Sequence, residues 1–181
     1  DFESEARAAD RDDQLAAATP CKNFRLSELI AHIGLLALAF DAAAKKDLGV
    51  LTDTSPPEIA QLDADWRTRY PVALAGLAAA WQDPGAWQGM TRAGGVDLPG
   101  EVAGLVALSE VVIHGWDVAR ASGHTYDVDE DVAGVVLAHV RSFATDGSVE
   151  GLFGPAVEIA DSAPTFARAL ALSGRDPAWR A

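Results

Sequence analysis

The chain of 181 residues has one cysteine, so no disulfide can form within it, and we expect a reducing, cytoplasmic environment. Basic residues are also few, 14 Lys and Arg against 27 Asp and Glu, which gives a formal charge of −13. This balance argues against nucleic acid and against an anionic membrane surface, because both bind proteins through Lys and Arg. No apolar run approaches the roughly 18 residues that span a membrane, and no signal peptide is evident. We therefore expect no nucleic-acid or membrane partner.

Strand-like alternation of apolar and polar residues is nearly absent, and the apolar spacing is helical along most of the chain. Helices are predicted over residues 1–15, 26–46, 57–81, 101–121, 128–145 and 165–173. In the helix over 57–81, the residues expected to face inward are Ile59, Leu62, Trp66, Tyr70, Val72 and Leu77. The segment 86–100 holds four glycines and is interpreted as a long connection. The sequence thus predicts one all-α domain over 1–181, with a helical body to about 145 and a tail over 146–181.

The segment 109–120 is a mostly apolar helix that carries a line of titratable side chains. At about 100° per residue, Glu110, His114 and Asp117 fall within roughly 60° of one another on one face. Burying an ionised carboxylate without a partner costs several kcal/mol. An i,i+4 Glu–His pair stabilises a helix by only about 0.2–0.5 kcal/mol. A divalent metal ion is therefore the leading candidate for the partner on this face.

A second histidine, His32, lies in another apolar helical run and shares a face with Leu29 and Leu36, so it is predicted to point inward. With Glu110 and His114 it makes a set of two imidazoles and one carboxylate. Zinc uses such a set in catalytic sites that keep a fourth position open. Cobalt, nickel and iron(II) suit the same ligands, because this set does not select among these metals by affinity alone.

Other titratable residues have more than one interpretation. Asp117 could orient a ligand imidazole, pair with Arg120 at i,i+3, or bind substrate. Arg120 could receive an anionic group if it faces the cavity. His139 lies in an apolar helix and is expected to be a core or rim histidine rather than a ligand. Cys21 is expected to be structural, although a nearby cation could lower the pKa of a catalytic thiol.

Three motifs resemble the DinB/YfiT-like metal-binding proteins, in particular the actinobacterial branch like the N-terminal domain of mycothiol-dependent maleylpyruvate isomerase. The first is Thr19-Pro20-Cys21 followed by Phe24, Leu26, Leu29 and His32; the second is Glu110-x-x-x-His114-Gly115-Trp116-Asp117; the third is the closing Gly174-Arg175-Asp176-Pro177-x-Trp179. Two positions depart from the pattern, because Phe24 replaces the usual tryptophan and Arg25 a common capping threonine. The resemblance implies a four-helix bundle with an additional short C-terminal helix, and His32, Glu110 and His114 as metal ligands.

The resemblance also implies a metal-dependent enzyme, a transferase or isomerase of a small molecule, with mycothiol as the thiol cosubstrate. The metal would lower the pKa of the thiol and present a thiolate to an electrophile. The isomerase's own reaction does not carry over, because the isomerase has a further C-terminal domain. Two alternatives stay open: a non-catalytic metal-binding or regulatory module, whose metal would have a closed, four-ligand site, and a bundle with an empty site. A bundle of this kind could also form a homodimer through an exposed apolar face.

Overall fold

The computed structural model describes residues 14–57, 60–144 and 153–181. Its elements are α2 (Leu26–Lys45), α3 (Trp66–Ala80), the 3-10 helix η2 (Pro84–Trp87), β1 (Met90–Ala93), β2 (Val96–Pro99), α4 (Gly100–Ala121), α5 (Glu130–Ala144) and α6 (Thr165–Leu172). Most of the predicted helices are present within a residue or two of their predicted ends. The predicted helix over 1–15 lies almost wholly outside the described residues, so the four-helix bundle stays a prediction.

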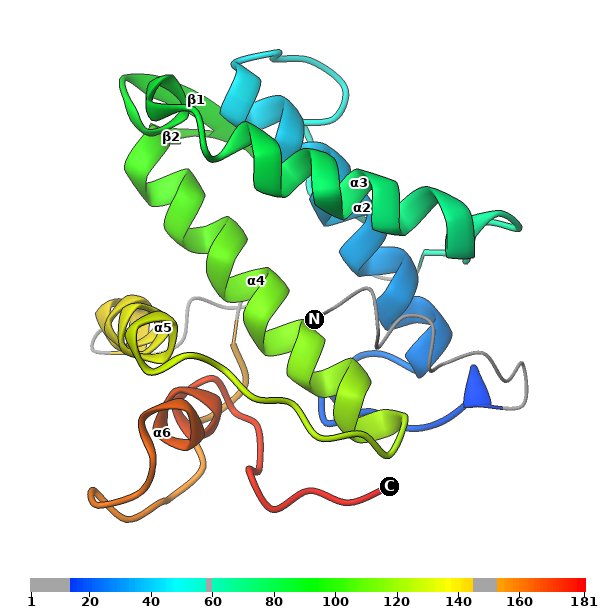
Figure 1. Ribbon diagram of the computed structural model, residues 1–181, viewed down its shortest axis with the longest axis vertical. Coiled ribbons are helices and arrows are strands. Elements are labelled where there is room, and N and C mark those ends of the chain that lie inside the picture. Colours follow the sequence, from blue (N-terminus) through cyan, green and yellow to red (C-terminus); the bar gives the residue numbers. More distant parts are fainter. Residues whose placement is uncertain (1–13, 58–59, 145–152) are drawn as a thin grey trace.

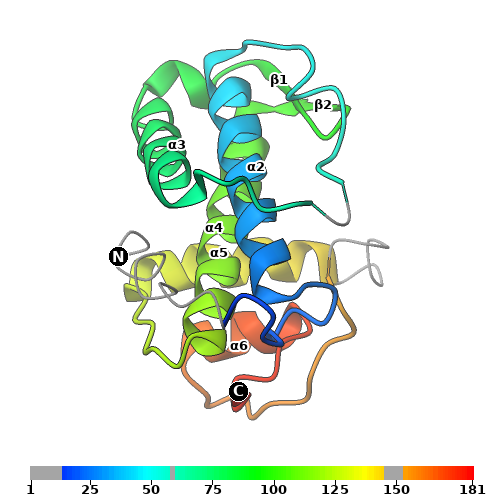
Figure 2. The ribbon, with the colours of Figure 1, turned by 90° about the vertical axis from the view of Figure 1, so that its right-hand side faces the viewer.

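Helices α2 and α4 run side by side, and α3 packs on α2 (Figure 1). Helices α5 and α6 pack on each other and lie crosswise against the lower half of α4 (Figure 2). Helix α4 is therefore buried against α2 along one side and α5 along another, which explains why it is apolar over most of its surface. Its polar line, Glu110, His114 and Asp117, lies where α2 and the C-terminal segments approach it.

Helices α2 and α4 are each long and apolar enough to cross a membrane by length and composition alone. The expectation that no segment reaches this length is therefore wrong. In the fold, however, 67% of each apolar window is buried inside the protein. Their apolar character is that of the two central core helices of a helical domain.

The segment 86–100 is not the irregular connection that the sequence predicts. Strands β1 and β2 form an antiparallel hairpin in which Met90 pairs with Pro99 and Ala93 with Val96. Gly94 and Gly95 make the two-residue turn with φ of 58° and 79°, values that favour glycine in such hairpins. The protein is therefore mostly helical rather than strictly all-α.

Helix α3 begins at Trp66, nine residues later than predicted. The Asp63 carboxylate folds back over the first turn, where it accepts a hydrogen bond from the Tyr70 hydroxyl at 3.2 Å. Trp66, Tyr70 and Leu77 are buried, as predicted, but Val72 is 69% exposed. Val72 is two residues from Tyr70, about 200° around the helix, so both cannot face the core.

Candidate metal centre

His32 on α2 and the pair Glu110 and His114 on α4 converge where the two helices face each other. Nε2 of His114 lies 3.1 Å from Oε2 of Glu110, and Nε2 of His32 lies 4.0 Å from the same oxygen. One potential ligand atom from each of the three residues lies within 4.8 Å of the others. The structure therefore brings together the three residues that the sequence predicts as a ligand set.

The three side chains are largely withdrawn from solvent, with exposed fractions of 16%, 15% and 8% for His32, Glu110 and His114. Burial lowers the pKa of His32 to about 4, so its imidazole is neutral at pH 7 and can act as a ligand. Burial also disfavours charge on Glu110 and His114. Other contacts outweigh it: the hydrogen bond to His114 lowers the pKa of Glu110, and the hydrogen bonds to Asp117 and Glu110 raise the pKa of His114.

Asp117, one turn beyond His114, is fully buried and contacts two side chains at once. Its Oδ2 lies 3.0 Å from Nδ1 of His114 and 3.1 Å from Nη2 of Arg175. Because a carboxylate oxygen accepts, Nδ1 of His114 donates to Asp117. Nε2 donates to Glu110 while it carries a proton, and it is the atom that a metal ion would take instead. This is the arrangement in which a carboxylate fixes the tautomer and orientation of a ligand imidazole.

The loop before α2 covers the site from one side. Thr19 is buried, and its Oγ1 lies 2.8 Å from the carbonyl oxygen of Cys21 and 2.9 Å from that of Phe24, which holds the loop in shape. The Phe24 ring stacks on His32 with a centroid separation of 4.8 Å and meets His114 edge-on at 6.3 Å. Phe24 thus supplies the aromatic wall over both imidazoles.

Cys21 lies closer to the site than its structural interpretation suggests. A ligand-type atom from each of Cys21, His114 and Asp117 lies within 4.8 Å of the others. Burial raises the pKa of the Cys21 thiol, against the opposing effect of Arg175, so the thiol is protonated at neutral pH. It is therefore not an activated nucleophile in this environment.

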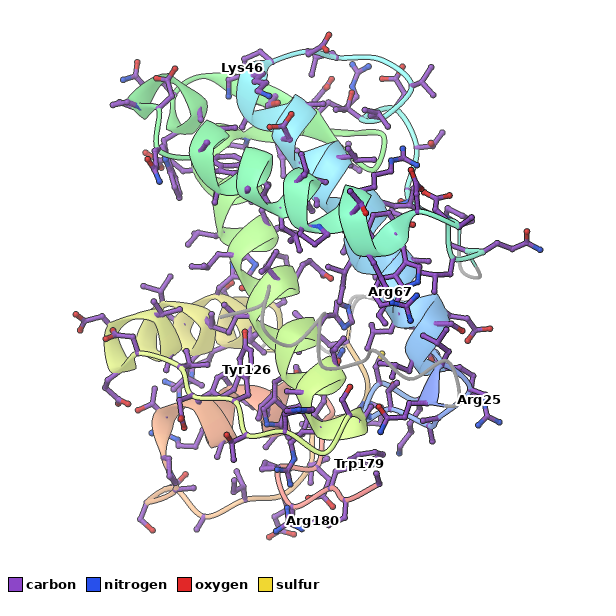
Figure 3. All side chains as sticks on the ribbon, turned by 45° about the vertical axis from the view of Figure 1, so that its right-hand side comes forward. Arg25, Lys46, Arg67, Tyr126, Trp179 and Arg180 are labelled. Carbon is purple, nitrogen blue, oxygen red and sulfur yellow. The ribbon has the colours of Figure 1, made fainter. Side chains whose placement is uncertain are left out.

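Two other predicted candidates lie elsewhere. Arg120 donates through Nη2 to the carbonyl oxygen of Trp179 at 2.9 Å, near the C-terminal end of α4, where Figure 3 labels Trp179. His139 on α5 is buried, packs edge-on against Phe143, and has its pKa lowered by burial. Neither His139 nor Asp117 joins His32, Glu110 and His114 as a fourth ligand atom within 4.8 Å among the described residues.

A small pocket lies beside His114, with a volume of about 10 Å³, enough for about one water molecule. It is lined by residues of α4 and of the C-terminal segment: Ser109, Glu110, Ile113, His114, Phe153 and Arg175. Sequence reasoning missed the contribution of Arg175, which lies 58 residues from Asp117 along the chain. Its local signals are the closing Gly174-Arg175-Asp176-Pro177 motif and the turn after α6, where Gly174 has a φ of 84°.

Comparisons with known proteins agree with this arrangement of helices. The solved structure of the mycothiol-dependent maleylpyruvate isomerase superimposes with a TM-score of 0.57, and that of a histidine-to-alanine mutant with 0.59. Both are 19% identical in sequence, and each match covers 83% of this chain and 68% of the other. At this identity the likeness concerns the fold.

Two proteins of Mycobacterium tuberculosis, from strains CDC 1551 and H37Rv, are each 26% identical over 132 residues. These matches cover 73% of this chain and 68% of the relatives, which are described only as uncharacterized. The sequence profile of one family, described as Mycothiol maleylpyruvate isomerase N-terminal domain, matches residues 1–119, a stretch that includes His32, Glu110, His114 and Asp117. This chain therefore belongs to the mycothiol maleylpyruvate isomerase N-terminal domain family.

Proposed function

We propose that this protein is a divalent-metal-dependent enzyme, a transferase or isomerase of a small molecule that uses mycothiol as its cosubstrate. His32, Glu110 and His114 would hold the metal, most simply zinc, with nickel, cobalt or iron(II) as alternatives. The observation that carries the proposal is the convergence of three potential ligand atoms, from largely buried side chains, within 4.8 Å, with no fourth protein ligand among the described residues. Membership of the mycothiol maleylpyruvate isomerase N-terminal domain family supports mycothiol as the thiol.

The chemistry of the donor set fits a metal ion. The lowered pKa of His32 keeps that imidazole neutral, and Glu110 supplies a carboxylate within 4.0 Å of both Nε2 atoms. His114 donates from Nδ1 to Asp117, so its Nε2 is the atom left for a ligand bond. His32 has no such hydrogen bond, since its buried Nδ1 lacks a partner among the described residues. Its ring is instead oriented by the stacked ring of Phe24.

The buried charges also call for a cation. The carboxylates of Glu110 and Asp117 and the guanidinium of Arg175 sum to one negative charge in a region of low solvent exposure, and the raised pKa of His114 shows that a positive charge is favoured there. A divalent cation bound by neutral histidines would change this sum to one positive charge, which favours an anion such as a thiolate beside it. When bound, the metal would act as a Lewis acid that lowers the pKa of the thiol.

The chain's own residues would position and shield the reactants. Asp117, held by Arg175, fixes the ring of His114. Phe24 covers both imidazoles and excludes water from that side, which strengthens electrostatic interactions within the site. The lack of a fourth protein ligand among the described residues favours an enzyme over a closed, non-catalytic metal module. A cytoplasmic location and a homodimer remain predictions.

Elemental analysis of untagged protein tests the metal. We expect about one equivalent of metal in the wild type and its loss in Glu110→Ala. The control is Glu101→Ala, because Glu101 lies on the same helix but is exposed at the first turn. Metal retained in Glu110→Ala, or absent from wild type with no thermal shift on adding zinc or nickel, would contradict the proposed metal centre.

An assay with mycothiol and a panel of small electrophiles tests the activity. Both thiol consumption and conversion of the electrophile are followed, because an isomerase returns the thiol. We expect turnover in the wild type and at least a hundredfold loss in His114→Ala, because the variant removes a ligand. His124→Ala is the matched control, since His124 is exposed and outside the site. An unchanged rate in His114→Ala would refute the assignment. Stoichiometric metal without turnover of any electrophile would favour the non-catalytic module.

A further inference from the structure

The pocket beside His114 has the size and the lining of a site for one water molecule. Its volume of about 10 Å³ lies at the lower end of the roughly 10–15 Å³ that a single water needs, which excludes a larger ligand. A buried water also needs two to four polar partners. The polar side chains that line the pocket are those of Ser109, Glu110, His114 and Arg175.

Ser109 presents a buried hydroxyl that the protein itself does not satisfy. The residue is 3% exposed and lies on α4 immediately before Glu110. A serine within a helix can bond the carbonyl oxygen four residues back, but Oγ of Ser109 has no hydrogen-bond partner among the described residues. Buried hydroxyls are normally bonded to protein or to ordered water, so a partner for Ser109 is expected in the pocket that it lines.

Arg175, which is 6% exposed, supplies unused donors as an independent observation. Of the five N–H bonds of its guanidinium, the Nε bond and one on Nη2 are directed to Oδ2 of Asp117, and one on Nη1 to the carbonyl oxygen of Ser173. One N–H bond on each terminal nitrogen therefore has no partner among the described residues. A buried guanidinium needs such bonds to be satisfied, because its charge is withdrawn from solvent.

Arg175 and Glu110 carry opposite charges and line the same pocket, yet no ion pair joins them among the described residues. A water molecule between two such groups bridges them with little loss compared with a direct bond. The two charges also fix its orientation: its oxygen accepts an N–H bond from Arg175, and one of its hydrogens is donated to the carboxylate of Glu110. Its remaining hydrogen or lone pair is left for Oγ of Ser109, so that all three residues are satisfied together.

We propose that this pocket binds one water molecule, which links Arg175 and Ser109 to Glu110 and so positions this carboxylate as a metal ligand. The water site depends only on groups of the chain, whereas its role toward a metal rests on the proposed function. Arg175 then acts on both ligands that α4 supplies, through Asp117 on His114 and through the water on Glu110. It is a positioning residue outside the family match over 1–119.

A high-resolution crystal structure of the metal-free protein tests the water site directly. We expect one ordered water within about 3.2 Å of Oγ of Ser109, of a terminal nitrogen of Arg175 and of a carboxylate oxygen of Glu110. Any other arrangement would overturn the site, including a direct ion pair between Arg175 and Glu110 or a pocket without ordered water.

Zinc affinity, measured on folded protein by competition with a chromogenic chelator, tests the positioning role. Losing a direct partner of a metal ligand typically costs about 10–100-fold in affinity, and we expect Ser109→Ala, which acts through the water, to cost at least about threefold. The matched control is Ser122→Ala, which we expect to cost less than about twofold, since Ser122 also has a buried, unpartnered hydroxyl but lies at the C-terminal end of α4, outside the pocket.

A merely structural role of Ser109 would lower the free energy of unfolding in Ser109→Ala and leave the zinc affinity unchanged. A loss of affinity below about threefold in this variant would therefore overturn the positioning role. If the wild type binds no zinc, the proposed metal centre and the positioning role both fail, while the crystal structure of the metal-free protein still decides whether the water site exists.

Discussion

Replacing Asp117 by asparagine tests how much the buried contact between Asp117, Arg175 and His114 stabilises the protein. The two partners of the ion pair have 0% and 8% of their side chains exposed, so solvent screens them little. The variant keeps the size of Asp117 but leaves the guanidinium of Arg175 buried without a counter-charge. Removing one partner of a buried pair costs about 3–5 kcal/mol, a large part of the roughly 5–15 kcal/mol that stabilises a typical domain.

The free energy of unfolding is obtained from urea titrations of metal-free protein at pH 7, followed by circular dichroism. Asp41→Asn is the control, because Asp41 pairs with Lys45 on the surface of α2, where the Lys45 side chain is 58% exposed. We expect Asp41→Asn to lower the free energy of unfolding by about 0.5 kcal/mol or less. Adding Arg175→Met to Asp117→Asn should restore part of the loss, since it removes the unpaired charge. A cost below about 1 kcal/mol for Asp117→Asn would refute this account of the pair.

Three further changes have expected outcomes. Because the pKa of His32 is lowered from 6.5 to about 4, the unfolded state binds more protons between these values, and the stability of metal-free protein should fall as the pH drops from 6.5 to 4. Urea titrations should show that the free energy of unfolding falls by roughly 3 kcal/mol more over this pH range in the wild type than in His32→Asn. The same pH dependence in both proteins would contradict the lowered pKa of His32. Iodoacetamide should alkylate Cys21 far more slowly in folded than in urea-unfolded protein at pH 8, because burial both shields the thiol and raises its pKa; equal rates would show an accessible thiol. Gly95→Ala should destabilise the protein by about 1–2 kcal/mol, because its Cβ would stand 2.7 Å from the carbonyl oxygen of Asp53 at a φ of 79°; Gly134→Ala, at an open helical position, should not.

The helices and the three side chains that converge could be predicted from the sequence because their signals are local. Glu110 and His114 are four residues apart on one helix, and His32 occupies the inward face of an apolar run, so helical spacing alone brings each side chain inward. Periodicity alone could not predict that α2 packs beside α4. The resemblance to a known family supplied that step.

The errors have identifiable physical reasons. The Gly94-Gly95 pair is a recognised hairpin signal, but the flanking strands are only four residues each and show little alternation. Val72 is apolar like much of α3, but the helical period places it away from the buried face. The closing motif includes Arg175, but its contact with Asp117 could not be predicted, because the docking of the C-terminal segment sets that contact.

The same long-range contact sets an order of assembly during synthesis. Residues of α4 leave the ribosome well before Arg175, so His114 and Asp117 are available while their side of the helix is still uncovered. An isolated carboxylate such as Asp117 stays hydrated until a cation reaches it. We therefore expect a loading stage, in which His32, Glu110 and His114 are accessible to a metal ion from solution, followed by a closing stage. The later segment that carries α6 and Arg175 would then cover the bound ion and slow its release.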